Sequence, residues 1–570
     1  MTDVQNNQNK DIAAHAAVER MLNVYFREHQ LYHRQPEDNI WHIPIDDSQQ
    51  LTGQFHYWSA MGHHAYESEI QLQQTNVTTV LAPLEVITKL CDKLGQGDAI
   101  LSERMSEISN DIKNSIARTA HYLAYREYQR TINPYILSEQ SLYLGHPFHP
   151  TPKSSVGFSE ADLQRYAPEC RAMFQLYYIA VAPGLIVERY VTGKADSVND
   201  TLLTLAKLSA SELTEGYMLL PLHPFQFNVL KDTADFQQWV AQGLIKVIGQ
   251  RGHVVYPTSS VRTVFAKELN IYLKLPIQVK ITNFVRTNDY EQVERTIDAA
   301  QVIAAIKTEY ETAQFKLMFE QGYRALRPHK TKENFDLLAN SAMIVREGIE
   351  NYHPQKEIHV LASLFETMPH SCNSLLSKQL SMSKLTVKTW LKDYLNLTLK
   401  PMLQLFVNTG VSLEGHVQNS LIELKDGRPI AYYVRDLEGV CLSRKKAEAA
   451  QLVPQVVANN SPVVYSDEAA WQRFKYYIIV NHLGHLVATV GKHNGEELTL
   501  WSYVRDILQS WSQEEATSAA WSTYVTDLCN SPVFAAKANL ISKIHDCSEN
   551  PIYTDIPNPI AMTKEVQYDT

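Results

Sequence analysis

Residues 254–286 read VVYPTSSVRTVFAKELNIYLKLPIQVKITNFVR and alternate short β-branched or aromatic runs with turn residues. The runs Ile271-Tyr272-Leu273 and Ile277-Gln278-Val279 are typical of strands, and prolines and polar residues separate them. The segment therefore predicts a sheet-rich region in the middle of the chain.

Helical periodicity flanks this region on both sides. Apolar residues recur at helical spacing in residues 11–32 and 81–130, and again in residues 293–326, 334–348 and 385–407. We therefore expect helices before and after the central sheet.

One hairpin interrupts the second helical region. Strand-like runs at 421–425 and 429–434 flank Asp426-Gly427, a pair that tight type I′ turns prefer because both positions need positive φ. The pattern predicts an α+β protein with three lobes. They are a helical lobe at residues 1–140, a lobe rich in antiparallel sheet at 141–330 and a mostly helical lobe with a β-hairpin at 331–570.

Composition narrows the class of protein. In 570 residues, 62 acidic side chains outnumber 52 basic ones, which gives no support for a nucleic-acid or anionic-membrane partner. The six cysteines form no CxxC or CxxH pair, so we expect reduced thiols rather than a disulfide framework or a zinc knuckle. The polar first ten residues lack the apolar core of a secretory signal, and we expect a soluble, cytoplasmic protein.

Familiar nucleotide and hydrolase motifs are absent from the sequence. It contains no GxxxxGK[ST], GxGxxG, HExxH or GxSxG pattern. A nucleotide would have to bind in another way.

A proline-rich segment at 145–158, GHPFHPTPKSSVGF, predicts a rigid loop. His146, His149 and Lys153 would present donors for a phosphate or carboxylate on this stiff support. Each histidine taken alone could instead be a surface or capping residue, and no nearby Cys or carboxylate completes a zinc site. A second His-Pro element contains His223, for which structural support is the favoured role.

Donor side chains are densest within residues 258–286, where Glu268 is the only acidic residue. On strands, Ser260 and Arg262 can point to one face. The alternative is a solvated basic strand edge, which does not explain the interleaved hydroxyl and amide groups. The segment predicts a local anion site made of Ser260, Arg262, Lys274, Thr282, Asn283 and Arg286.

The third informative segment begins at Glu414-Gly415-His416 and ends, after the hairpin, at Arg435-Asp436-Leu437-Glu438-Gly439. Asn419, Asp436 and Glu438 offer hard oxygen ligands, which Mg²⁺ prefers together with substrate phosphates. Taken alone, Arg435-Asp436 would more often be a surface ion pair, and Glu414 with His416 an ordinary polar turn.

Together these segments resemble the IucA/IucC family of NRPS-independent siderophore synthetases. The resemblance rests on GHPFHPxxK, on SSVRT with a downstream Lys and TNxxR, and on EGHxQN followed by RDxEG, in that order. It covers residues 142–439 and extends weakly to 476–483, where Asn481-His482-Leu483 is similar to a later family element. It implies a cradle of thumb, fingers and palm with ATP and substrate between fingers and palm, and a homodimer.

The resemblance also implies roles for single residues. The nucleotide would be held by His149, Lys153, Ser260, Arg262, Thr263, Lys274 and Asn419. Magnesium would be held by Asn419, Asp436 and Glu438. The carboxylate substrate would contact Thr282, Asn283, Arg286, Glu414 and His416. The catalytic residues would be Lys274, Arg286, Glu414 and His416. The chain departs from many relatives at Ser154-Ser155-Val156, where a further basic residue is expected.

The predicted activity is that of an ATP-dependent ligase in siderophore biosynthesis for iron acquisition. It would adenylate a carboxylate of citrate or of a citrate mono-amide and condense it with an amine to form an amide, releasing AMP and pyrophosphate. Lys274 and the arginines would stabilise the transferring phosphate, and Glu414 or His416 would accept the proton of the amine. Two other classes remain open, a kinase-like phosphotransferase that releases ADP and a non-enzymatic carboxylate- or siderophore-binding protein.

Overall fold

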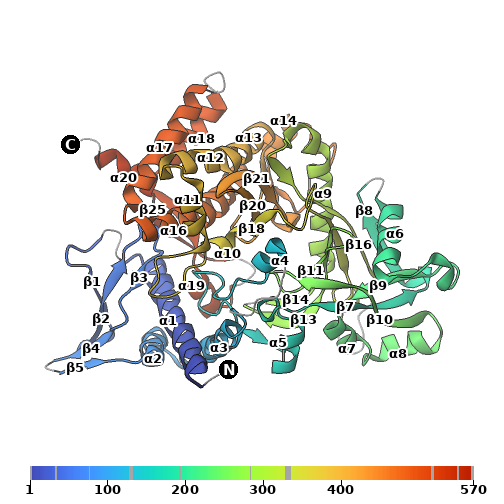
Figure 1. Ribbon diagram of the computed structural model, residues 1–570, viewed down its shortest axis with the longest axis horizontal. Coiled ribbons are helices and arrows are strands. Elements are labelled where there is room, and N and C mark those ends of the chain that lie inside the picture. Colours follow the sequence, from blue (N-terminus) through green and yellow to red (C-terminus); the bar gives the residue numbers. More distant parts are fainter. Residues whose placement is uncertain are drawn as a thin grey trace.

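The computed structural model is an α+β protein, as predicted. It describes residues 3–31, 35–75, 77–126, 133–191, 194–282, 284–327, 336–514, 519–547 and 551–566. In Figure 1 the N-terminal elements lie at one side, a large sheet lies at the other, and the C-terminal helices lie above both. Within the described ranges, no helix is long and apolar enough to cross a membrane.

The N-terminal part combines three long helices with a sheet that the sequence did not predict. The strands at residues 49–57, 71–74 and 77–80 are rich in Gln and Thr, so their hydrophobic alternation is weak. The strand order is β1-β2-β4-β5, with β3 on β2, and Trp41 and Phe55 from the sheet pack against Phe26 of α1. The elements are α1 (Asp3–Glu28), β1 (Ile40–Pro44), β2 (Gln49–Tyr57), β3 (Ala65–Tyr66), β4 (Gln71–Gln74), β5 (Val77–Val80), α2 (Pro83–Leu94) and α3 (Ala99–Leu123).

The middle part is built on an eight-stranded antiparallel sheet, which confirms the strands expected in residues 254–286. Its order is β8-β16-β17-β12-β11-β10-β7-β9, and a small sheet β14-β13-β6 lies apart from it. The elements are α4 (Pro134–Glu139), β6 (Ser155–Val156), α5 (Glu160–Tyr166), β7 (Phe174–Val181), β8 (Ile186–Tyr190), α6 (Ala195–Ala206), β9 (Met218–Leu222), α7 (Pro224–Leu230), α8 (Ala234–Ala241), β10 (Ile245–Pro257), β11 (Thr263–Ala266), β12 (Ile271–Lys274), β13 (Ile277–Ile281), β14 (Phe284–Arg286), α9 (Tyr290–Tyr310), β16 (Glu320–Leu326) and β17 (Met343–Glu347).

Two expected helical stretches differ from the structure, one in part and one throughout the residues described. The helix predicted over 293–326 ends at Tyr310, and residues 320–326 form β16. The helix predicted over 334–348 is wrong in the residues described, because turns lead there into strand β17; residues 334 and 335 lie outside the described ranges. Both strands are almost wholly buried, so neither shows the alternation of a half-buried strand, and the period does not separate helix from strand there.

The C-terminal part is mostly helical and carries the predicted hairpin. Asp426 and Gly427 have φ of 50° and 74°, the positive values that the turn requires. Its four-stranded sheet has the order β15-β21-β20-β18. The elements up to the π-helical segment η5 are β15 (Phe315–Leu317), β18 (Glu357–Val360), α10 (Leu361–Phe365), α11 (Leu375–Ser383), α12 (Val387–Leu397), α13 (Leu399–Thr409), β19 (Val411–Ser412), β20 (Ser420–Lys425), β21 (Arg428–Val434), β22 (Cys441–Ser443), α14 (Arg444–Ala449), β23 (Val464–Tyr465), α15 (Asp467–Phe474) and η5 (Lys475–Leu483).

The last elements return to the beginning of the chain. Leu540 of α19 is buried in the core of the N-terminal part, and its backbone N–H and that of Ile541 donate to Glu28 of α1. The first and last parts therefore share one core. The remaining elements are α16 (Gly484–Asn494), α17 (Glu497–Glu514), α18 (Ala519–Asn530), β24 (Val533–Lys537), α19 (Asn539–Ile544), β25 (Tyr553–Pro557) and α20 (Pro559–Val566).

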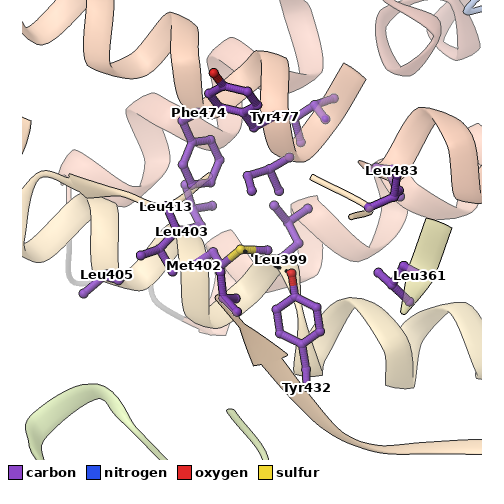
Figure 2. Close-up of a cluster of buried hydrophobic side chains, with 14 of the residues drawn as sticks. Leu361, Leu399, Met402, Leu403, Leu405, Leu413, Tyr432, Phe474, Tyr477 and Leu483 are labelled. Carbon is purple, nitrogen blue, oxygen red and sulfur yellow. Dashed lines mark hydrogen bonds between the residues drawn. The ribbon is translucent and has the colours of Figure 1, made fainter. Parts of the chain in front are cut away.

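A large apolar cluster supports the C-terminal part from inside. Figure 2 shows Leu399, Met402 and Leu403 packed together, with Phe474 and Tyr477 at one side of the cluster. The Tyr477 hydroxyl points away from the other side chains drawn. The ring is thus fixed by the core while its polar end is directed outward.

Candidate functional site

A cavity of about 1000 Å³ lies where the middle and C-terminal parts meet, and it collects nearly all of the residues singled out in the sequence. Thr263 is buried in β11 and is not among the lining residues. Asn283 lies outside the described residues. The predicted residues that line the cavity are His149, Lys153, Ser260, Arg262, Lys274, Thr282, Arg286, Glu414, His416, Asn419, Asp436 and Glu438.

Lys274 occupies the centre of a buried charge network at one end of the cavity. Its Nζ lies 2.9 Å from Asp436 Oδ1 and 2.9 Å from Glu438 Oε2. Burial alone would lower the pKa of Lys274, but the two carboxylates raise it above its ordinary value. Lys274 is therefore a fixed positive charge.

Arg346 of β17 extends this network. Its guanidinium lies 3.2 Å from Asp436 Oδ1 and donates from Nε to Glu320 Oε1 at 2.8 Å. Burial would raise the pKa of Asp436, but Lys274 and Arg346 hold it well below its ordinary value. We call Lys274, Glu320, Arg346, Asp436 and Glu438 the paired end of the cavity, because each cation there has a carboxylate partner.

Two further arginines stand next to the paired end without a carboxylate within ion-pair distance in the described part of the chain. Arg262 donates to Thr287 O and Asn288 Oδ1, both at 2.7 Å. Arg286 donates to Ile281 O and Thr282 Oγ1 at 3.2 and 3.0 Å. Burial and then the charge of Arg262 lower the pKa of Arg286 to about 10. Both remain positive at neutral pH and suit an anionic ligand.

The loop that carries Ser260 and Arg262 differs from expectation. It is a turn between β10 and β11, not a strand, and Val261 has a φ of 65°. Both side chains nevertheless line the cavity. The turn, rather than strand alternation, brings them to one side.

The proline-rich loop forms another wall. Lys153 makes a buried ion pair with Glu169. His149 Nδ1 accepts the backbone N–H of Thr151 at 3.1 Å, so in the neutral ring the proton is on Nε2. His223, from the second His-Pro element, caps α7 by accepting from Phe225 N and packs on Tyr166 and Phe174, away from the cavity lining. The structural role favoured for His223 fits this position.

Glu414 and His416 also line the cavity. His416 Nδ1 accepts backbone N–H groups of Gln418 and Asn419 at 3.2 and 3.3 Å, and burial lowers its pKa. A neutral His416 then carries its proton on Nε2 and can donate, but cannot accept, at that atom. Glu414 is left as the acceptor of the two. A Cβ at Gly439 would lie 1.7 Å from Glu414 Oε2, so only glycine leaves room for this carboxylate.

Arg435 does not form a surface ion pair with its neighbour Asp436, which is what the two residues taken alone would suggest. It is buried and pairs with Glu139 of α4, which also accepts from the backbone N–H and hydroxyl of Ser259. This contact ties the turn that carries Ser260 and Arg262 to the end of β21. The pair is structural.

Donors for a magnesium ion are present without a preformed cage. The described residues contain no group of three or more His, Cys, Asp or Glu side chains arranged to hold a metal. Asp436 and Glu438 do converge, since both lie 2.9 Å from one ammonium, and Asn419 also lines the cavity. Two carboxylates and an amide fit Mg²⁺ when substrate phosphates complete its shell.

Sequence reasoning missed several lining residues. Arg346 follows three apolar residues in Met343–Glu347. A charged residue next to such an apolar run was the sequence signal that could have identified it as a buried site residue. Arg473 and Tyr477 are four residues apart where α15 runs into η5, and Tyr477 falls in the weakly similar stretch 476–483, but neither was singled out. Lys537 of β24 lies 60 residues further along the chain than Tyr477, and no local pattern connects it to them. All six cysteines are free, as expected.

Comparisons with known proteins identify relatives of this chain. Residues 134–366 match the model of the IucA / IucC family, and residues 388–552 match that of the ferric iron reductase FhuF-like transporter. The chain is 56% identical to the L-2,3-diaminopropanoate–citrate ligase of Staphylococcus aureus (strain NCTC 8325 / PS 47), over 98% of this chain and 99% of that one. It is 26% identical to the spermidine–citrate ligase of Bacillus anthracis, over 97% and 98%.

A solved structure has the same fold. ATP-bound aerobactin synthetase IucA from a hypervirulent pathotype of Klebsiella pneumoniae superposes with a TM-score of 0.84 at 24% identity, covering 96% of this chain and 99% of that one. The described architecture is therefore that of a known enzyme fold, helices and sheets in the same arrangement.

Proposed function

This chain belongs to the IucA/IucC family of NRPS-independent siderophore synthetases, and we propose that it joins citrate to L-2,3-diaminopropanoate at the expense of ATP. The observation that carries the proposal is 56% identity, over nearly the full length of both chains, to a ligase of those two compounds. The kinase and binding-protein alternatives lose their support, because relatives across the family are ligases and synthetases.

The first step would activate one citrate carboxylate. A carboxylate oxygen attacks the α-phosphorus of ATP, the bond to the β-phosphate breaks, and pyrophosphate leaves. Lys274, Arg262 and Arg286 line one side of the cavity and would stabilise the negative charge that develops on the phosphate. Ser260, His149 and Lys153 would contact the nucleotide, and Thr282 would orient Arg286 toward the acid.

The second step would form the amide. The amine nitrogen attacks the carbonyl carbon of the acyl-adenylate, and AMP leaves with the bonding electrons of the C–O bond. The amine must lose one proton, and Glu414 is the acceptor supported by the hydrogen bonds at His416. His416, with its proton on Nε2, would donate to a substrate oxygen.

The proposal extends to cofactor, assembly and location. Asn419, Asp436 and Glu438 would hold Mg²⁺, which when bound neutralises charge on the triphosphate. We also propose a homodimer, on the basis of the family resemblance, and action in the cytoplasm, where ATP is available. Light scattering of the purified protein tests the assembly.

The deciding experiment incubates the purified protein with ATP, Mg²⁺, citrate and L-2,3-diaminopropanoate and separates the products. We expect AMP, pyrophosphate and one citryl amide, each dependent on citrate. Replacing the amine by hydroxylamine should give citryl hydroxamate, which reports activation alone. Formation of ADP, or no nucleotide turnover with citrate, would contradict the proposal.

A further inference from the structure

Two cations lie around one tyrosine ring at the end of the cavity formed by α15, η5 and β24. The Arg473 guanidinium carbon is 5.4 Å from the centre of the Tyr477 ring, and Lys537 Nζ is 5.1 Å from it. Lys537 Nζ also donates to the Tyr477 hydroxyl at 3.2 Å. All three residues line the cavity, and we call them the open end.

The charges of the open end are not balanced in the way those of the paired end are. Within the described ranges, Arg473 and Lys537 take part in no ion pair, whereas Lys475, two residues from Arg473, pairs with Asp527 at 3.0 Å. Arg473 donates one N–H group to Gly439 O at 3.3 Å. Its buried Nε has no hydrogen-bond partner among the described residues. Cations that are withdrawn from water without a carboxylate are costly unless an anion joins them.

Glu414, an acidic group whose charge acts on both cations of the open end, is already assigned as the acceptor of the amine proton. Glu414 interacts with the Tyr477 hydroxyl and exerts its charge on both Lys537 and Arg473, but lies beyond ion-pair distance of either. A carboxylate acceptor and two cations therefore flank the same tyrosine. This arrangement is complementary to a zwitterion, with its ammonium or amine toward Glu414 and its carboxylate toward Arg473 and Lys537.

The acid donor has cations of its own elsewhere. The carboxyl group that reacts with ATP must lie beside the phosphates, and Arg262 and Arg286 offer positive charge there. The open end consists of residues from other elements, next to the proton acceptor that the incoming amine needs. Its position fits the nucleophile better than the acid.

We propose that Arg473 and Lys537, supported by the Tyr477 ring, bind the carboxylate of the amine substrate and so select an amino acid over a plain diamine or polyamine. The assignment rests on the proposed function and names the class of nucleophile for that site. Arginine supplies two parallel N–H donors to the carboxylate, and lysine supplies a compact charge.

The test compares three variants with the wild-type protein. Arg473→Gln and Lys537→Gln each remove one charge of the open end. Lys475→Gln is the matched control. It removes a charge two residues from Arg473, but Lys475 pairs with Asp527 and neither residue lines the cavity. The amines are L-2,3-diaminopropanoate, 1,2-diaminoethane, which is the same diamine without the carboxylate, and hydroxylamine.

We expect each open-end variant to raise the KM for L-2,3-diaminopropanoate about tenfold or more, the effect of losing one charge-assisted contact. The KM for citrate and the rate of hydroxamate formation should stay within about twofold, which also demonstrates that the variants are folded. The preference of the wild-type protein for the amino acid over 1,2-diaminoethane should fall by a similar factor. Lys475→Gln should leave every value unchanged.

Other results overturn the assignment in distinguishable ways. A raised KM for citrate, or a parallel loss of hydroxamate, would mean that these cations bind the acid donor instead. An unchanged KM for L-2,3-diaminopropanoate in both variants would mean that they bind no substrate carboxylate. A wild-type protein that makes no citryl hydroxamate would overturn the proposed function itself, and this assignment with it.

Discussion

The two ends of the cavity handle positive charge in opposite ways. At the paired end, Lys274 and Arg346 are held by Asp436, Glu438 and Glu320. At the open end, Arg473 and Lys537 lie beside the Tyr477 ring, with no carboxylate of the described residues within ion-pair distance. Cations with internal partners are fixed before any ligand arrives, while cations without them gain most from a ligand. The first kind suits a fixed positive scaffold beside the reacting phosphate, and the second, to which Arg262 and Arg286 also belong, suits direct contact with an anionic ligand.

The largest expected effect comes from removing one carboxylate of the paired end, which leaves a buried cation short of a partner. Glu320→Ala should leave Arg346 buried with only Asp436 beside it, and should lower the free energy of unfolding by about 3–5 kcal/mol, as for other buried pairs that lose one partner. Denaturant unfolding measures the loss. Glu107→Ala, which removes a solvent-exposed partner of Arg104, is the control and should cost less than about 1 kcal/mol. Equal losses would mean that the buried pair is not special.

Removing a cation that has no carboxylate should affect activity without affecting stability. Arg286→Ala should reduce citrate-dependent AMP release about a hundredfold or more, because one donor to the developing charge is lost. It leaves no orphan carboxylate behind, since Arg286 contacts only Ile281 O and Thr282 Oγ1 in the described structure. Unfolding measured on the same sample should match the wild-type protein. A large drop in stability would show that Arg286 is part of the scaffold.

A double-mutant cycle sharpens the description of the open end. If Arg473 and Lys537 hold the same carboxylate, the second substitution should cost less than the first. We expect about tenfold in KM for L-2,3-diaminopropanoate from each alone and about thirtyfold together, rather than the product of the two. Steady-state kinetics of the single and double variants measure the coupling. Strict multiplication would indicate two independent contacts.

A buried group away from both ends shows what burial does without charge partners. Burial lowers the pKa of His223 from 6.5 to about 3. Because the unfolded chain then binds the proton more strongly, His223 contributes stability above pH 6.5 that is lost as the pH falls toward its folded pKa. Between pH 6 and pH 5 the wild-type protein should lose about 1 kcal/mol relative to His223→Asn, which keeps a capping acceptor. Unfolding curves at the two pH values test this, and a constant difference would exclude it.

Local sequence signals located most of the candidate site. Some residues are unusual for their sequence context and mark positions in the site. Examples are the prolines around His149, the hydroxyls next to Arg262 and the glycine after Glu438. Twelve of the predicted residues line one cavity although they come from separate segments of the chain. The hairpin at Asp426-Gly427 was predictable for a similar reason, since its turn needs two positive φ values.

Other features were decided only in three dimensions. The strand that carries Arg346 reads as an apolar run because it is buried on both faces, so its period could not separate strand from helix. Four of the five strands of the N-terminal part have five residues or fewer, too few to show a clear hydrophobic alternation one by one, and the sheet forms because its strands pair with each other and pack on α1.

The sequence by itself determined the fold class, the family and three residues of the paired end, Lys274, Asp436 and Glu438, because those depend on turn chemistry, period and contiguous motifs. Only the tertiary structure assembled the open end, where α15, η5 and β24 meet around Tyr477. It also assigned the histidine protons, because the backbone N–H groups bonded to His149 and His416 fix which ring nitrogen accepts. Charge balance and proton position are properties of neighbours in space, which adjacency along the chain does not specify.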